Sequence, residues 1–134
     1  MPRELNILQA NLHKMSPVQD ALYNDLDIWH FDAILIQEPH YFEFEDDIHI
    51  TGVGPNFELV KPRQDRIQGQ RVRSCIWANK KNEFLQIQTG YADVTAIRMT
   101  IDDRHVLIAS VYIPSIGTQT EEGEREDKQQ TTDM

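Results

Sequence analysis

The segment from Leu5 to Pro39 constrains the fold most, because it reads as a strand, a helix and a second strand in direct succession. Apolar residues on both sides of the Leu5 to Ala10 run predict a strand that is covered on both faces. A second apolar run, Ala33 to Ile36, ends before Pro39, whose ring removes the donor that a further ladder bond needs. A helix between two strands makes a crossover connection, so we expect the strands to pair in parallel.

The helix between these strands has a recognisable start. Ser16 is predicted as the N-cap, Pro17 takes the first helical position, and Gln19 would complete a capping box with Ser16. Apolar residues then recur at helical spacing and predict one buried stripe that ends in a core aromatic. The residues of this stripe are Val18, Ala21, Leu22, Leu26 and Trp29.

Beyond Pro39 the helical pattern gives way to short strand patterns. The turn-forming cluster Asp102-Asp103-Arg104 predicts that the last two of these strands form a hairpin. Within one strand pattern, Cys75 and Trp77 are expected to be buried, the first as an inert thiol and the second as a core aromatic. The predicted strands are Phe57 to Val60, Ser74 to Ala78, Leu85 to Gln88, Val94 to Ile101 and Val106 to Tyr112.

The chain of 134 residues divides into a body, residues 1–116, and an acidic tail, residues 117–134. The tail contains no large apolar residue except the terminal Met and has a net charge of -4, so we expect it to be disordered. The body is one domain's worth of sequence or less. Because no apolar run is long enough to cross a bilayer, we expect an intracellular protein, and a nuclear one if it acts on DNA.

Charge along the chain is unevenly distributed. The net charge of -9 argues against a protein that holds nucleic acid through its overall field, since phosphate binding depends on clustered Lys and Arg. Residues 61–81 reverse the balance with a local charge of +6, which makes this segment the one plausible phosphate-facing patch, although such a run can also be a solvated loop. The predicted DNA contacts are Lys61, Arg63, Arg66, Arg71 and Arg73.

Three polar residues stand at the ends of predicted apolar strands: Asn11, Glu38 and Tyr112. In open α/β sheets, sites form where strands end, because side chains from several strands meet there. An amide oxygen and a carboxylate suit a hard divalent cation, and a phenol can donate to a phosphate oxygen. A turn Asn, a solvated Glu and a packed Tyr ring are the ordinary alternatives. The histidines His13, His30, His49 and His105 show no spacing that would build a transition-metal site.

Four segments carry a resemblance to a known family: LNILQAN from Leu5, FDAILIQEP from Phe31, CIWANK from Cys75 and HVLIASVYIPS from His105. Their order resembles the endonuclease/exonuclease/phosphatase superfamily, and most of all the endonuclease domain of non-LTR retrotransposons. The resemblance extends to about Ser115 and implies an α/β fold, here a partial four-layer α/β/β/α sandwich. It also implies hydrolysis of phosphodiester bonds with Mg2+ or Mn2+.

The resemblance assigns roles to the three strand-end residues. Asn11 matches the family's Asn that organises the phosphate and the metal, and Glu38 matches the Glu that binds the metal. Tyr112 matches the Tyr of a Tyr-x-Pro-Asn motif, although Ser115 stands here in place of the Asn. The resemblance therefore predicts Asn11, Glu38 and Tyr112 as catalytic residues, with Glu38 and Asn11 as metal ligands.

The family's second-half motifs do not occur in this sequence. These are an Asp-x-Asn motif that orients the attacking water and a terminal Ser-Asp-His motif. We therefore interpret residues 1–116 as the N-terminal half of such a domain, and the chain as a truncated DNA endonuclease. The alternatives are a non-catalytic fragment or interaction module of the same fold, and a phosphatase of that fold. An uncovered sheet would also favour self-association.

Overall fold

A computed structural model describes residues 3–25, 28–44, 47–50, 55–62 and 72–113. The predicted tail, residues 117–134, and three of the predicted DNA contacts, Arg63, Arg66 and Arg71, lie outside these ranges. No helix in the described ranges has the length and apolar character that a membrane crossing requires. The elements are β1 (Ile7–Asn11), α1 (Ser16–Tyr23), the 3-10 helix η1 (Ile28–His30), β2 (Ala33–Gln37), β3 (Phe42–Phe44), β4 (Asp47–His49), β5 (Phe57–Val60), β6 (Ser74–Asn79), β7 (Glu83–Ile87), β8 (Val94–Ile101) and β9 (Arg104–Val111).

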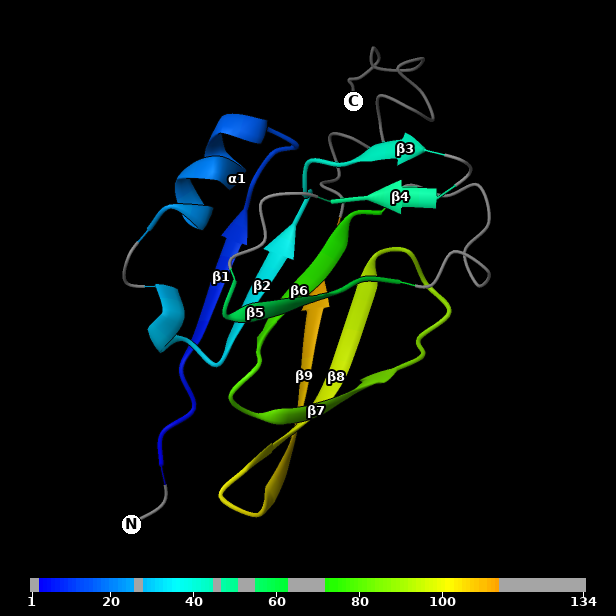
Figure 1. The fold of residues 1–134 in the computed structure, drawn as a ribbon. Helices are drawn as coiled ribbons and strands as arrows, with labels where there is room; N and C mark the ends of the chain where they lie inside the picture. Colours follow the sequence, from blue (N-terminus) through cyan, green and yellow to red (C-terminus); the bar gives the residue numbers. More distant parts are fainter. Residues whose placement is uncertain (1–2, 26–27, 45–46, 51–54, 63–71, 114–134) are drawn as a thin grey trace, which may run out of the picture.

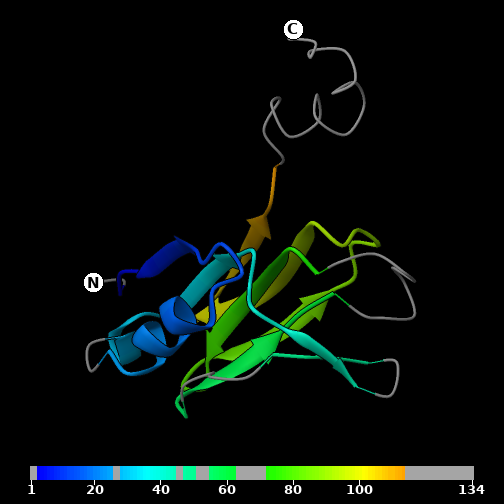
Figure 2. The same cartoon turned by 90° about the horizontal axis from the view of Figure 1, so that it is seen from above.

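The described strands form two packed sheets and a separate hairpin (Figure 1). The first sheet has the order β1-β2-β6-β5, and its β1–β2 pair is parallel, which confirms the predicted crossover unit. The second sheet has the order β7-β8-β9 and packs on β2 and β6. Figure 2 shows α1 beside the β1–β2 pair, and the β3–β4 hairpin lies on the opposite side of the molecule from α1. The described residues thus supply three layers, helix, sheet and sheet; they do not supply the fourth layer of the predicted sandwich.

Two apolar clusters hold these layers together. Side chains of β2 and β6 alternate between them, so that Ile34 and Trp77 face the helical layer while Ile76 and Ala78 face the second sheet. Every residue of β6 is buried, as expected for a strand with neighbours in its sheet and a layer on each face. The predicted burial of Trp77 and Cys75 is confirmed, and burial raises the pKa of the Cys75 thiol.

The first strand differs from the prediction of a covered strand. β1 lies at the edge of its sheet, and Ile7, Gln9 and Asn11 are exposed. The second sheet packs beneath β2 and β6, so one face of β1 has no layer over it. Apolar residues on both sides of a short run therefore did not distinguish an edge strand from a central one.

The helix begins where predicted but is capped differently. Its N-cap is Met15, which makes no side-chain cap, so the predicted capping box is wrong. Gln19 is instead buried, and its side chain binds the backbone of His40, accepting from the N–H at 3.1 Å and donating to the carbonyl at 3.5 Å. The helix ends at Tyr23, and Trp29 belongs to η1. Because Trp29 is 50% exposed, with its ring stacked 3.9 Å from that of His30, its prediction as a core aromatic is also wrong.

The later strands follow the sequence pattern closely. β5 and β8 have the predicted bounds, and the β8–β9 hairpin is confirmed with Asp102 and Asp103 at its turn. Both turn residues have a positive φ, 51° and 65°, as the tight type I′ connection between twisted strands requires. The β3–β4 hairpin was not predicted, because three-residue strands are too short to show a period.

A buried polar network joins the two sheets near the carboxyl ends of β2 and β9. Gln37 donates to the Ser110 hydroxyl at 3.0 Å, and that hydroxyl donates to the carbonyl of Ile36 at 3.1 Å. Beside it, the hydroxyls of Ser74 and Thr95 lie 2.9 Å apart. Since buried hydroxyls and amides are costly to leave unpaired, these bonds fix how the strand ends of the two sheets face each other.

Candidate active site at the ends of three strands

The topology brings the three predicted site residues to one end of the molecule. β1, β2 and β9 all end at the upper side of Figure 1, where Asn11, Glu38 and Tyr112 follow or close them. β6 runs antiparallel to β2 and therefore begins at the same end, preceded by Arg73. We call this end the rim and define it by Asn11, Glu38, Arg73 and Tyr112.

Backbone strain is concentrated at the rim. Glu38 has a φ of 53°, and His13 and Lys14 have values of 52° and 60°. The conformation of Glu38 is held by two backbone bonds, from its N–H to the carbonyl of Arg73 and from the N–H of Lys14 to its own carbonyl, each 2.8 Å long. Non-glycine residues in this region are strained and gather at functional sites. The strain fixes where the Glu38 side chain leaves the sheet.

The Glu38 carboxylate interacts with two other side chains. Its Oε1 atom is 3.6 Å from Nδ1 of His13, a residue to which the sequence pattern gave no role. The carboxylate also interacts with the hydroxyl of Tyr112. Burial raises the pKa of Tyr112, Glu38 raises it further, and Arg73 partly opposes this. Tyr112 therefore keeps its proton through the neutral range and can act as a hydrogen-bond donor.

Arg73 and Asp93 hold the ring of Tyr112 in place. The guanidinium carbon of Arg73 lies 5.3 Å from the centroid of this ring, within the range of a cation–π contact. Nε of Arg73 is 3.2 Å from Oδ1 of Asp93, an ion pair in which the N–H is not aligned for a hydrogen bond. The backbone of Asp93 also accepts the N–H of Tyr112 at 2.9 Å. Sequence reasoning missed Asp93, which stands before a strand in no recognisable motif.

Asn11 closes the first strand and shapes the turn that follows it. Its Oδ1 atom accepts a hydrogen bond from the backbone N–H of His13 at 2.9 Å. This is the role of a turn Asn, which the sequence offered as the alternative to a catalytic role. Asn11 pairs in register with Gln37, which places it beside the strand that leads to Glu38. None of the contacts among the described residues joins the Asn11 side chain to Glu38, so the structure brings Glu38 and Tyr112 into contact and Asn11 only near them.

The oxygen donors at the rim suit one class of metal ion. Glu38 offers a carboxylate and Asn11 an amide oxygen, whereas the Asp93 carboxylate already faces Arg73. In the part of the chain that is described, no group of three or more His, Cys, Asp and Glu residues forms a metal cluster. Mg2+ keeps several waters and is bound through one or two carboxylates together with substrate phosphates, so this donor set fits Mg2+ and not a structural Zn2+.

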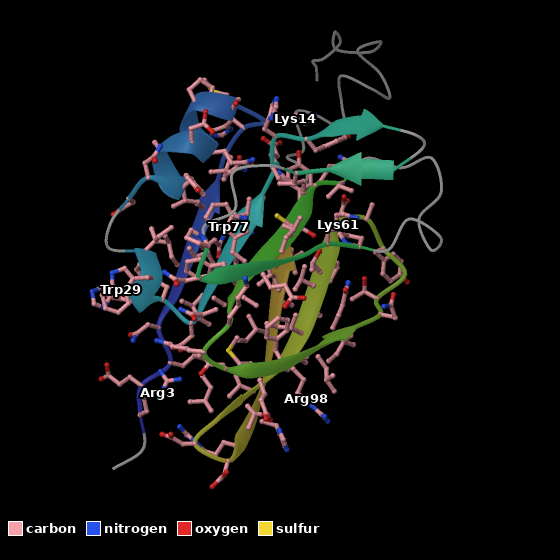
Figure 3. All side chains as sticks on the ribbon, in the orientation of Figure 1. Arg3, Lys14, Trp29, Lys61, Trp77 and Arg98 are labelled. Atoms are coloured by element: carbon pink, nitrogen blue, oxygen red, sulfur yellow. The ribbon has the colours of Figure 1, made fainter. Side chains whose placement is uncertain are left out.

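The described residues of the basic segment lie at both ends of β6. Arg73 precedes β6 at the rim, whereas Lys80 and Lys81 follow β6 at its other end, about 20 Å away for a six-residue strand. Lys81 faces the buried carboxylate of Asp32 at 3.7 Å. Lys61 follows β5, which is antiparallel to β6, and so lies toward the end at which β6 begins. Figure 3 labels Lys61. Since Arg63, Arg66 and Arg71 lie outside the described residues, contact of residues 61–81 with phosphate stays a prediction.

Comparison with solved structures finds a likeness in fold. No family model and no curated protein sequence matches the chain. Among solved structures, the endonuclease domain of TRAS1, a telomere-specific non-LTR retrotransposon, is similar with a TM-score of 0.61 and 17% sequence identity. The match covers 93% of this chain and 54% of that one, so the chain spans about half the length of the domain it resembles. This likeness confirms the predicted α/β fold, which is similar to about half of a retrotransposon endonuclease domain, whereas the four-layer arrangement stays a prediction.

Proposed function

We propose that this chain carries the metal-binding and phosphate-facing part of a DNA endonuclease that depends on Mg2+ or Mn2+. The observation that carries the proposal is the placement of Glu38, which is strained, held by backbone bonds and in contact with Tyr112 where three strands end. The shared fold with a retrotransposon endonuclease domain supports nucleic acid as the substrate class.

Each rim residue has a role in this proposal. Glu38, with Asn11 nearby, would ligate the cation, which when bound neutralises phosphate charge and stabilises the leaving oxygen. Tyr112 would donate to a non-bridging phosphate oxygen, since it stays protonated at neutral pH. Arg73 would place a fixed positive charge beside that oxygen, held by Asp93 and the Tyr112 ring.

DNA is the proposed partner, and Lys61 and Arg73 are the described basic residues that would meet its backbone. Arg63, Arg66 and Arg71 belong to the same proposal through their sequence positions alone. Phosphate contacts of this kind position a duplex without reading its bases, so we expect cleavage with little sequence preference and strong sensitivity to salt.

A second candidate function is a non-catalytic interaction module of the same fold. One observation favours it: the side of the β7-β8-β9 sheet that faces away from β2 and β6 carries exposed apolar residues, among them Leu85 and Leu107. Large exposed apolar patches mark surfaces that bind other proteins.

Nicking of supercoiled plasmid DNA distinguishes the two candidates. We expect the purified chain to nick with Mg2+ or Mn2+, to lose this activity in chelator, and to lose at least about 100-fold in rate in Glu38→Gln. Glu58→Gln, which changes an exposed glutamate on β5, is the matched control and should nick as the unsubstituted chain does. A chain that is folded by circular dichroism but does not nick would favour the interaction module.

A further inference from the structure

A tryptophan side chain is exposed at the end of the molecule opposite the rim. Trp29 lies on η1, which precedes β2 at the end of that strand away from Glu38. It is half exposed, whereas tryptophan side chains in folded proteins are on average highly buried. The His30 ring stacks against the indole, and Figure 3 shows Trp29 at the edge of the molecule, away from the buried Trp77. The indole therefore has ring surface that a ligand can cover.

Two hollows adjoin Trp29, and basic residues line one of them. One hollow has a volume of about 260 Å³ and extends toward Tyr23 and Phe57. The other has a volume of about 270 Å³, and no acidic side chain stands among the described residues that line it. We call this second depression the Trp29 hollow and define it by Trp29, Pro55, Asn56, Asn79, Lys80 and Lys81. An aromatic ring and two lysines thus meet at one place on the surface.

One buried side chain holds the aromatic and the basic parts of the Trp29 hollow together. Nδ2 of Asn79 donates to the carbonyl of Trp29 at 3.1 Å and to that of Phe31 at 2.9 Å. Oδ1 of Asn79 accepts from the backbone N–H of Lys81 at 3.0 Å. Because Asn79 is buried and both of its N–H groups are used in this way, it fixes η1 against the turn after β6. A ligand would therefore meet the ring and the lysines already in place, which lowers the cost of binding.

The two lysines differ in the charge that they offer to a ligand. Nζ of Lys81 lies 3.7 Å from the carboxylate of Asp32, which also faces Arg3. Lys80 is exposed, and its side chain forms no ion pair within the described part of the chain. The backbone of Lys80 is held by the carbonyl of Asn56, which accepts its N–H at 2.9 Å. Lys80 therefore offers the Trp29 hollow an ammonium group that an anionic ligand can approach.

The size of the hollow and its combination of groups indicate the ligand. Pockets that enclose a whole small molecule have volumes of about 300 to 1,000 Å³, so a hollow of about 270 Å³ better fits one unit of a polymer. Proteins hold single-stranded nucleic acid by stacking bases on exposed aromatic rings and placing basic groups along the phosphates. Acidic side chains of a peptide would meet Lys80 but would bring no flat ring to the indole. We propose that the Trp29 hollow binds one unpaired base of a nucleic-acid strand, with Lys80 on an adjoining phosphate.

This contact with nucleic acid is separate from the rim. Lys80 follows β6, whereas Arg73 precedes it, about 20 Å away for a six-residue strand. The inference rests on the proposed function for its ligand class alone, since neither metal nor cleavage takes part in it. Binding can therefore be measured in chelator, and Glu38→Gln should bind a single strand at Trp29 as the unsubstituted chain does. A chain that fails to nick DNA can still pass this test, so the two proposals fail independently.

Quenching of tryptophan fluorescence tests the proposal on the full chain. The sequence has two tryptophans, and Trp77 is buried, so a stacked base can quench only Trp29. We expect a thymidine strand of about 12 nucleotides to quench the emission in chelator at about 50 mM salt. Trp29→Phe should abolish this quenching. Lys80→Gln should weaken the binding at least about 3-fold and lower the slope of log affinity against log salt by about 0.7, the value for one phosphate.

Lys14→Gln is the matched control for Lys80→Gln. It removes the same charge from another exposed lysine, which Figure 3 shows far from Trp29, and should leave the quenching titration unchanged. Both lysines are exposed, so neither substitution should shift the unfolding midpoint. An equal loss of affinity in the two variants would show that net charge alone matters and would contradict the role of Lys80.

Three further probes separate a stacked base from other anions. A strand of the same length whose sugars carry no bases keeps the phosphates and should not quench, and polyglutamate should not quench either. A duplex should bind at Trp29 at least about 10-fold more weakly than the single strand, because its bases already stack on one another. Equal quenching by the base-free strand or by polyglutamate would overturn the proposal. Absence of quenching by the thymidine strand at about 1 mM would overturn it as well.

Discussion

Replacing Asp32 with alanine is expected to lower the free energy of unfolding by about 3 to 5 kcal/mol, because it removes one partner from a buried charge network. The Asp32 side chain is fully buried at the start of β2. Its oxygens accept from Nη1 of Arg3 at 3.2 Å, from Nδ2 of Asn82 at 2.9 Å and from the backbone of Asn6 at 2.9 Å. The carboxylate thus ties the N-terminal segment to the turn after β6. Urea denaturation at pH 7 measures the loss.

The same network predicts how stability depends on pH. Burial by itself would raise the pKa of Asp32, but the hydrogen bonds from Arg3, Asn6 and Asn82 outweigh it and hold the pKa below its ordinary value of 3.8. A carboxyl group whose pKa is lower in the folded than in the unfolded protein stabilises the folded state at pH values above the pKa of the unfolded state. This stabilisation is lost as the pH falls through the pKa of the folded state. The difference in unfolding free energy between wild type and Asp32→Ala should therefore be constant near neutrality and should shrink once the pH falls below this ordinary value of 3.8.

Asp20→Ala is the control for Asp32→Ala, since Asp20 is an exposed aspartate on α1 and its loss should change the unfolding free energy by no more than about 0.5 kcal/mol. Equal effects of the two substitutions would show that the Asp32 network contributes nothing beyond an exposed charge.

Replacing Arg73 with alanine is expected to reduce metal-dependent plasmid nicking by about 100-fold while the protein stays folded. The guanidinium is fixed beside Asp93 and over the Tyr112 ring, next to the hydroxyl that would face a phosphate oxygen. Both members of the Arg73–Asp93 pair are about one-third exposed, so the stability cost should stay within about 1 kcal/mol. Single-turnover nicking rates together with thermal unfolding separate the two effects.

Two further variants show whether the charge of Arg73 acts on substrate. Arg73→Lys keeps the charge but loses the planar contact with Tyr112, so we expect partial recovery of the rate. In the double variant Arg73→Ala with Asp93→Asn, the carboxylate no longer stands unpaired at the rim. If Arg73 serves only to neutralise Asp93, this double variant should nick like the wild type, which would contradict the proposed contact with phosphate.

Much of the architecture could be predicted because its signals are local. The crossover from Leu5 to Pro39 and the β8–β9 hairpin follow from apolar runs and turn residues, and both are present. What the prediction missed depends on contacts between distant residues. Gln19 has the spacing of a capping residue, yet its side chain binds the backbone of His40. Trp29 fits a helical stripe, but the helix ends before it.

In the candidate site too, residues with a local signal could be predicted, and residues placed by contacts between distant parts of the chain could not. Glu38 and Tyr112 were predicted because each stands at a strand end, and topology brings strand ends together. His13 and Asp93 could not be predicted, since one reaches the rim through a left-handed turn and the other through its pairing with Arg73. Neither feature leaves a local signal in the sequence.

The central claim is that the rim binds a divalent cation through Glu38, and calorimetric titration with Mg2+ and then Mn2+ tests it most directly. We expect one weak site in the unsubstituted chain and in Glu58→Gln, and an affinity at least about 10-fold lower in Glu38→Gln. Equal affinity in Glu38→Gln and the unsubstituted chain would contradict it, because the ion would then bind elsewhere.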